Sequence, residues 1–170
     1  MRTQTREAGE TRGETMDRIY RVTPQSCIAC GKCELACSFA HGSDGRPAQS
    51  RIHIFRRGPE AGTPVVCLQC DDAACLAVCP VGALSWNLRT GAIEVSQETC
   101  IRCRMCVVAC PFGNMHWDEG RHEVAKCDLC GGDPRCVPFC PTGALAWLTP
   151  AAAVRPAEPT ATRDGLPGDR

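Results

Sequence analysis

The residues best suited to chemistry in this chain are its cysteines, and one run of them sets the pattern for the rest. The segment 100–111 reads C-x-x-C-x-x-C-x-x-x-C-P, with cysteines at Cys100, Cys103, Cys106 and Cys110. This spacing holds a cubane [4Fe–4S] cluster through thiolate ligands. Three thiolates at steps of three residues wrap around one cube, whereas the fourth lies on the helix that follows and points away. We therefore expect the fourth cysteine to complete a second cube, together with another motif.

Three further motifs contain all the remaining cysteines of the sixteen. Two of them also end in Cys-Pro, whereas the N-terminal motif carries Ser38 in place of the proline. Their members are Cys27, Cys30, Cys33 and Cys37, then Cys67, Cys70, Cys75 and Cys79, and finally Cys127, Cys130, Cys136 and Cys140. Because each motif supplies four thiolates, the sequence predicts four [4Fe–4S] clusters with these sixteen cysteines as iron ligands.

Zinc is the alternative metal, because C-x-x-C pairs also build zinc ribbons. A zinc site uses two such pairs, often with histidine, and does not need a third cysteine at the next step of three. None of the four histidines, His41, His53, His116 and His122, stands at a ligand spacing, so we expect them to be surface or packing residues. A zinc-bound interaction module is therefore the less favoured reading.

Composition and charge exclude several classes of function. The formal net charge of the 170 residues is +0, which argues against a basic nucleic-acid-binding face. No segment contains about 18 consecutive apolar residues, so we expect no membrane insertion. The N-terminal segment lacks the apolar core of a signal peptide, which predicts a cytoplasmic protein whose cysteines bind metal. Aromatic residues make up only 5% of the chain, so cluster ligation must supply part of its stability.

Between the motifs, the sequence predicts short elements of an α+β protein. The near-identity of segments 80–84 (PVGAL) and 141–145 (PTGAL) indicates two related units, each with two motifs. Alternating apolar residues and glycine turns predict strands at 19–22, 51–56 and 144–148, and hairpins at 85–96 and 114–125. The rest of 39–62 is expected to be a loop that covers a cluster face or contacts a partner.

The ends of the chain and the residues beside the motifs carry weaker expectations. Segment 1–17 is expected to be a disordered extension, and the Pro- and Ala-rich segment 149–170 a flexible tail. The basic residues beside the motifs are expected to be solvated: Lys32, Arg102, Arg104, Lys126 and Arg135. The tryptophans are expected to shield clusters from water: Trp86, Trp117 and Trp147.

The pairing of the motifs stays open on spacing alone. Sequential pairing joins the first motif with the second and the third with the fourth. Nested pairing joins the first with the fourth and the second with the third. The sequence contains neither a dinucleotide-binding motif nor a Walker motif, and no nucleophile stands apart from the cysteine motifs. It therefore gives no indication of a catalytic site.

Over residues 19–148, the four motifs resemble those of four-cluster ferredoxin-like electron-transfer subunits, such as the iron–sulfur subunits of dimethyl-sulfoxide-reductase-type enzymes. The resemblance implies nested pairing within one polyferredoxin domain, 18–148, made of two pseudo-symmetric ferredoxin-like units. One unit would comprise 18–62 and 121–148, and the other 63–120. Some relatives have tryptophan at the second ligand of the third motif and hold a three-iron cluster there. Cys103 occupies that position here, so four cubanes are expected.

The resemblance also implies four ligand sets, numbered here for later use. The first ligand set is Cys27, Cys30, Cys33 and Cys140, and the second is Cys37, Cys127, Cys130 and Cys136. The third ligand set is Cys67, Cys70, Cys75 and Cys110, and the fourth is Cys79, Cys100, Cys103 and Cys106.

A narrower resemblance lies in segments 33–41 (CELACSFAH), 50–52 (SRI) and 127–134 (CDLCGGDP). These look most like the small subunit of tungsten-dependent aldehyde oxidoreductase, an enzyme of anaerobic metabolism, and like similar carbon monoxide dehydrogenase partners. The resemblance implies a non-catalytic subunit that relays electrons from a large tungsten- or molybdenum-pterin subunit to a flavin, NAD-reducing subunit or a ferredoxin. Self-association is a further implication. The alternatives are a diffusible polyferredoxin and a partner of hydrogenase, formate dehydrogenase or carbon monoxide dehydrogenase.

Overall fold

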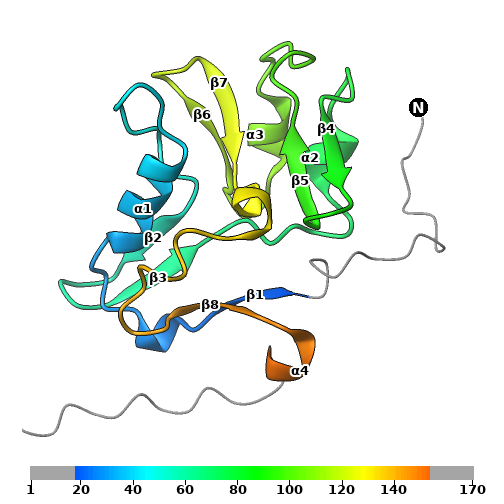
Figure 1. The fold of residues 1–170 in the computed structure, drawn as a ribbon. Helices are drawn as coiled ribbons and strands as arrows, with labels where there is room; N and C mark the ends of the chain where they lie inside the picture. Colours follow the sequence, from blue (N-terminus) through cyan, green and yellow to red (C-terminus); the bar gives the residue numbers. More distant parts are fainter. Residues whose placement is uncertain (1–17, 154–170) are drawn as a thin grey trace, which may run out of the picture.

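The computed structural model describes residues 18–153, in which eight short strands form four antiparallel two-stranded sheets joined by short helices (Figure 1). A single hairpin of this size is marginally stable in water. The sheets must therefore be held by contacts with one another and around the cysteine motifs. This confirms the α+β class that the sequence predicts.

The first and last strands of the described chain lie side by side. β1 (Ile19–Val22) pairs with β8 (Leu145–Leu148), so Tyr20 stands opposite Trp147, with ring centroids 6.3 Å apart. This pairing brings the first motif next to the fourth. β8 is followed by the short helix α4 (Pro150–Ala153), which lies in the segment expected to be a tail. The expectations for 1–17 and for the rest of the tail fall outside the described residues.

Both predicted hairpins are confirmed. The first consists of β4 (Leu84–Asn87) and β5 (Ala92–Val95), and the second of β6 (Met115–Asp118) and β7 (Glu123–Lys126). Each follows a Cys-Pro segment and leads directly towards the next motif. The hairpins therefore fix where successive motifs stand relative to each other.

The predicted strand at 51–56 is shorter than expected and has a partner that the sequence did not reveal. β2 (His53–Arg56) pairs with β3 (Gly62–Val65), and Pro64 stands within the second of these strands. Proline cannot donate to a sheet ladder, so it argues against a central strand and is tolerated in a two-stranded ribbon. Gly62 is needed because a Cβ there would meet Ile54 Cγ2 at 2.6 Å.

The first three helices are brief and begin inside the cysteine motifs. α1 (Lys32–Ala40) carries Cys33 and Cys37, α2 is Ala74–Ala77, and α3 is Met105–Ala109. Cys110, expected on a helix, directly follows α3 at its C-terminal cap. Single 3-10 turns lie at Pro24–Ser26 (η2) and Leu129–Gly132 (η3). Within the described residues, no helix has the length and apolarity needed to cross a bilayer.

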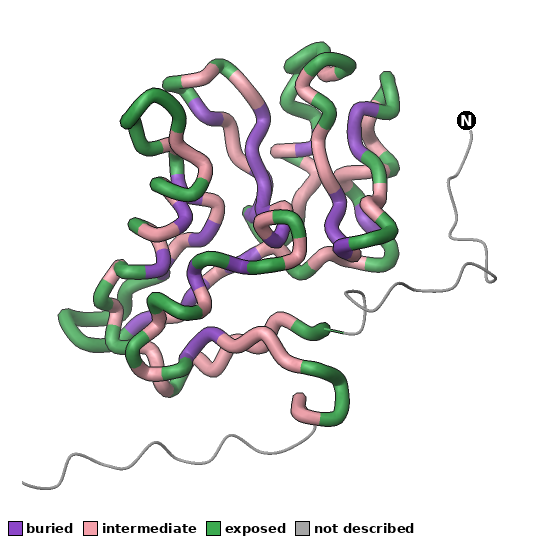
Figure 2. The backbone as a smooth tube through the Cα atoms, in the orientation of Figure 1, coloured by how far each residue is buried: buried purple, intermediate pink, exposed green. Residues whose placement is uncertain are grey.

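Two small cores, rather than one, support these elements. The first core joins Ile52, Ile54 and Leu145 to buried cysteines of the first and fourth motifs. The second core joins Leu84, Ile93 and Val124 to Cys106, with cysteines of the second and third motifs packed against it. Figure 2 shows the buried stretches in the interior of the molecule, with exposed residues at the outer turns. Since cysteines are members of both cores, the packing depends on what the cysteines bind.

Candidate metal centres

All four C-x-x-C loops share one unusual backbone conformation. The residue before the second cysteine of each motif has a positive φ although none of the four is glycine: 55° at Ala29, 50° at Gln69, 59° at Arg102 and 56° at Leu129. A side chain in this left-handed region costs roughly 1 kcal/mol or more per residue. Strain of this kind persists where the surrounding structure fixes it, and it concentrates at functional sites. Its recurrence at one position indicates that all four loops wrap around the same kind of group.

The three Cys-Pro segments end in a second repeated turn. Gly82, Gly113 and Gly143 have φ values of 64°, 65° and 66°, and each donates its N–H to the carbonyl of the cysteine three residues earlier. In two of these turns the next backbone N–H reaches the cysteine sulfur: Ala83 N–H to Cys79 Sγ at 3.2 Å and Asn114 N–H to Cys110 Sγ at 3.4 Å. Backbone donors aimed at sulfur stabilise thiolates, which suits iron ligands.

The structure brings together the cysteines of the third and fourth ligand sets. Those of the third set line one cavity with Ile93 and Lys126: Cys67, Cys70, Cys75 and Cys110. Those of the fourth set line a second cavity with Val95 and Val124: Cys79, Cys100, Cys103 and Cys106. Each cavity is lined by three cysteines of one motif and a single cysteine of the other. Cys103 is exposed, so the fourth ligand set reaches the surface.

The first and second ligand sets lie in and around the first core. Besides burial, nearby charges at Cys136 and Cys140 help to raise the pKa of Cys33. In the same way, charges at Cys37 and Cys130 help to raise the pKa of Cys136. Residues of the first and fourth motifs are therefore neighbours, although about a hundred residues separate them in the sequence. Cys30 is exposed and lies outside the core cluster.

Burial makes these thiols poor acids without a bound cation. It raises the pKa of Cys33 to about 12 and the pKa of Cys106 and Cys136 to about 11. A buried thiolate is stable only when positive charge lies close to it. Iron supplies that charge, and its binding displaces the proton. All sixteen cysteines are free of disulfides, so each sulfur is available as a ligand.

Three polar groups from distant segments contact sulfurs of the second ligand set. Tyr20 Oη lies 3.0 Å from Cys136 Sγ, and the backbone N–H of Arg51 lies 3.2 Å from Cys37 Sγ. Burial, and then the charge of Cys136, raise the pKa of Tyr20 well above its ordinary range, so its hydroxyl keeps its proton. The Tyr20 hydroxyl is therefore a hydrogen-bond donor to any thiolate at Cys136.

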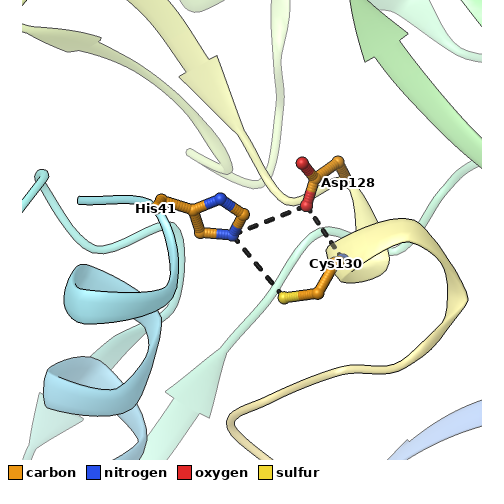
Figure 3. A group of neighbouring side chains, drawn as sticks. All are labelled: His41, Asp128 and Cys130. Atoms are coloured by element: carbon orange, nitrogen blue, oxygen red, sulfur yellow. Dashed lines mark hydrogen bonds and ion pairs between the residues drawn. The ribbon is translucent and has the colours of Figure 1, made fainter. Parts of the chain in front are cut away.

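The third of these contacts is made by His41, at the C-terminal end of α1. Its Nε2 lies 3.6 Å from Cys130 Sγ and 3.5 Å from Asp128 Oδ1 (Figure 3). The expectation that the histidines are ordinary surface or packing residues is wrong for His41. Its position four residues after Cys37 was the available signal, since residues at that spacing share one face of a helix.

Asp128 organises the loop around Cys130. Its Oδ1 accepts the backbone N–H of Cys130 at 2.9 Å (Figure 3). Its Oδ2 accepts Arg51 Nη1–H at 2.6 Å. Burial alone would raise the pKa of Asp128, but Arg51, His41 and the Cys130 N–H together hold it below its usual value. The carboxylate is therefore charged at neutral pH. It links Cys130, the second cysteine of the fourth motif, to Arg51 in the segment before β2.

Lys126 overturns the expectation that the basic residues beside the motifs are solvated. Its side chain is only 3% exposed, whereas Lys32, Arg102, Arg104 and Arg135 are exposed as expected. The tryptophans take positions consistent with shielding, because Trp147 packs against the first core and Trp86 and Trp117 against the second.

Comparison with known proteins identifies the chemistry of these loops. Residues 61–149 match a protein family described as "4Fe-4S dicluster domain", and residues 24–40 match one described as "4Fe-4S binding domain". The chain belongs to the 4Fe-4S dicluster family. The repeated loop geometry and the sets of free, buried thiols fit [4Fe–4S] clusters, for which four thiolates per cluster are the usual ligands.

Relatives of this dicluster protein include electron carriers and larger subunits. It is 42% identical over 128 residues to the aliphatic sulfonate oxidoreductase, polyferredoxin-like subunit of Pyrococcus furiosus, covering 75% of this chain and 74% of that one. It is 37% identical to the electron transport protein HydN of Escherichia coli, covering 76% and 87%. It is 40% identical to the NADH-dependent phenylglyoxylate dehydrogenase subunit beta of Aromatoleum evansii, of which it spans 32%. The dicluster protein is thus an iron–sulfur electron-transfer protein and not itself an enzyme.

Proposed function

We propose that the chain holds four [4Fe–4S] clusters in the four ligand sets and relays electrons through them for a large catalytic oxidoreductase subunit. The observation that carries the proposal is the shared loop backbone of all four motifs, with Gln69 and its three counterparts in the left-handed region. The proximity of first-motif to fourth-motif cysteines, and of second-motif to third-motif cysteines, favours nested rather than sequential pairing. Two pseudo-symmetric units, 18–62 with 121–148 and 63–120, follow from that pairing.

The burial and proximity of the cysteines support a spatial order of the four clusters, from the first ligand set to the fourth. Cys30 of the first set and Cys103 of the fourth set are exposed, whereas Cys127 of the second set is buried and is influenced by Cys67 of the third. Bound clusters supply one-electron carriers at each set. The exposed cysteines of the first and fourth sets offer two places at which a partner could approach a cluster.

The client enzyme is the finer part of the proposal. The segments around Cys37 and Cys130 favour a tungsten- or molybdenum-pterin subunit, in particular an aldehyde oxidoreductase, with electrons passing to a flavin subunit or ferredoxin. The naming of the Pyrococcus relative as a subunit of an oxidoreductase supports an attached rather than a diffusible carrier. Purification from the native host should recover a large pterin-containing subunit in fixed ratio. Recovery of the chain alone would favour a free polyferredoxin.

The cluster number and the nested pairing have a direct test. Anaerobically purified protein should contain about four clusters, or sixteen irons, per chain. Nested pairing places Cys110 and Cys75 in one set, so Cys110→Ser and Cys75→Ser should remove the same electron paramagnetic resonance signal, and Cys106→Ser a different one. Matching spectra for Cys110→Ser and Cys106→Ser would overturn the pairing. Colourless protein with about four zinc ions would overturn the cluster assignment altogether.

A further inference from the structure

The buried side chain of Lys126 stands at the junction of the two cores. Lys126 is 3% exposed and ends β7, immediately before Cys127. Its Nζ donates to three acceptors, namely Gln69 Oε1 at 3.0 Å, the carbonyl of Cys127 at 2.8 Å and the carbonyl of Ile93. An ammonium has three N–H groups, so its hydrogen-bonding capacity is filled.

None of these acceptors is charged. All three are amide oxygen atoms, two from the backbone and one from Gln69. A desolvated ammonium is unfavourable unless negative charge lies near it. Lys126 lines the same cavity as Cys70 and Cys75 and directly precedes Cys127. Burial raises the pKa of all three thiols, and the positive charge of Lys126 offsets part of that rise. The negative charge that balances Lys126 is therefore that of the ligand sulfurs.

Gln69 holds the ammonium in this position. Its Oε1 also accepts the backbone N–H of Ile93 at 2.9 Å, and its Nε2 donates to the carbonyl of Cys127 at 2.8 Å. Gln69 is itself one of the four strained residues of the C-x-x-C loops, with φ of 50°. The loop of the second motif, β5 and the start of the fourth motif are thus tied to one point.

We propose that Lys126 is a fixed positive charge shared by the second and third ligand sets, which raises the reduction potentials of the clusters there. This inference rests on the proposed cluster assignment. A [4Fe–4S] unit with four thiolates carries about −2 when oxidised and gains one further negative charge on reduction. A desolvated cation beside it stabilises the reduced form more than the oxidised form. Lys126 lines the third-set cavity and adjoins Cys127 of the second set. It therefore stabilises the reduced form of the clusters in both of these sets.

Replacement of Lys126 by methionine tests this role, with Lys32→Met as the matched control. Lys32 also directly precedes a ligand cysteine, Cys33, but it is exposed. In a potentiometric titration followed by electron paramagnetic resonance, Lys126→Met should lower the reduced-to-oxidised ratio of two clusters at least tenfold at fixed potential. For a one-electron couple that ratio corresponds to about 59 mV. The other two clusters, and all four in Lys32→Met, should keep their potentials.

A second variant covers the case in which Lys126→Met fails to assemble. Gln69→Glu keeps the lysine and places a carboxylate against it, so the same two clusters should again become harder to reduce. Iron loss with unchanged potentials in the surviving clusters would show a purely structural role and overturn the inference. So would equal shifts in all four clusters. If wild-type protein itself lacks four clusters, it is the proposed function that fails, before either variant is measured.

Discussion

The ion pair between Asp128 and Arg51 makes a measurable prediction about how firmly iron is held. Asp128→Asn removes the carboxylate charge but keeps an oxygen that can accept the Cys130 N–H. The pair is short, 2.6 Å, and its side chains are only 17% and 29% exposed for Arg51 and Asp128. Exposed ion pairs contribute about 0–1 kcal/mol, and breaking a fully buried pair costs about 3–5 kcal/mol. We expect a loss of about 2 kcal/mol for this half-buried pair.

That loss should appear as faster iron release from the second ligand set. A free-energy change of about 2 kcal/mol corresponds to roughly 30-fold in an equilibrium constant. If iron leaves through local opening of the Cys130 loop, capture by a ferrous chelator should accelerate about 30-fold for one cluster and little for the others. Because the pKa of Asp128 is lowered, its contribution is complete above the ordinary carboxyl range and is lost as pH falls through the lower, folded-state value. Assays at pH 7 therefore compare the charged Asp128 carboxylate of the wild type with the neutral amide of the variant.

The same motif offers the control. Asp133 pairs with Arg135 at 3.6 Å, but these side chains are 77% and 61% exposed. Asp133→Asn should leave the rate of iron release within about twofold of wild type, since such pairs contribute little. Equal rates for Asp128→Asn and Asp133→Asn would refute the argument that burial of the ion pair stabilises the loop.

Two further predictions concern Tyr20 and Gly62. Tyr20→Phe removes the hydroxyl 3.0 Å from Cys136 Sγ, so one cluster should fall in potential by about 30–60 mV, or roughly 0.7–1.4 kcal/mol, with unchanged iron content in a potentiometric titration. A potential equal to wild type would show that the hydroxyl does not tune this site. Gly62→Ala places a Cβ 2.6 Å from Ile54 Cγ2 and 3.3 Å from Ala29 Cβ, and should cost about 1–3 kcal/mol in urea unfolding followed by cluster absorbance. Gly58→Ala, whose Cβ meets nothing within 4 Å, is the control and should unfold as wild type does.

Local patterns predicted the elements well, because their causes are local. Strand 19–22 has the predicted bounds, and the hairpins at 84–95 and 115–126 differ from expectation by a residue or two. Each depends on alternation of apolar residues and on a glycine turn, which neighbouring residues determine. The cysteine spacing is equally local, since the loop between two cysteines must itself curve around the metal. The left-handed residue in each loop is the structural counterpart of that spacing.

What the sequence could not predict are contacts between distant segments. β3 was not predicted, because Pro64 argues against a strand. Its pairing with β2 in a two-stranded ribbon explains why the proline is tolerated there. Lys126 was expected in solvent, since a lysine next to a polar motif is ordinarily exposed. Its burial depends on Gln69 and Ile93, which lie 57 and 33 residues away. Charge inside a core is stable only when several such partners converge.

The asymmetry among the four sites follows from the same distinction between local and distant contacts. Donors to Cys79, Cys110 and Cys100 are backbone groups of their own turns, supplied by the repeated motif. The partners of Cys136, Cys37 and Cys130 are Tyr20, Arg51 and His41, which the pairing of β1 with β8 and the path from α1 to β2 bring to the second set. Hydrogen bonds to ligand sulfur are a principal means of tuning an iron–sulfur site. The motifs thus make the four sites alike, whereas the fold makes the second one different.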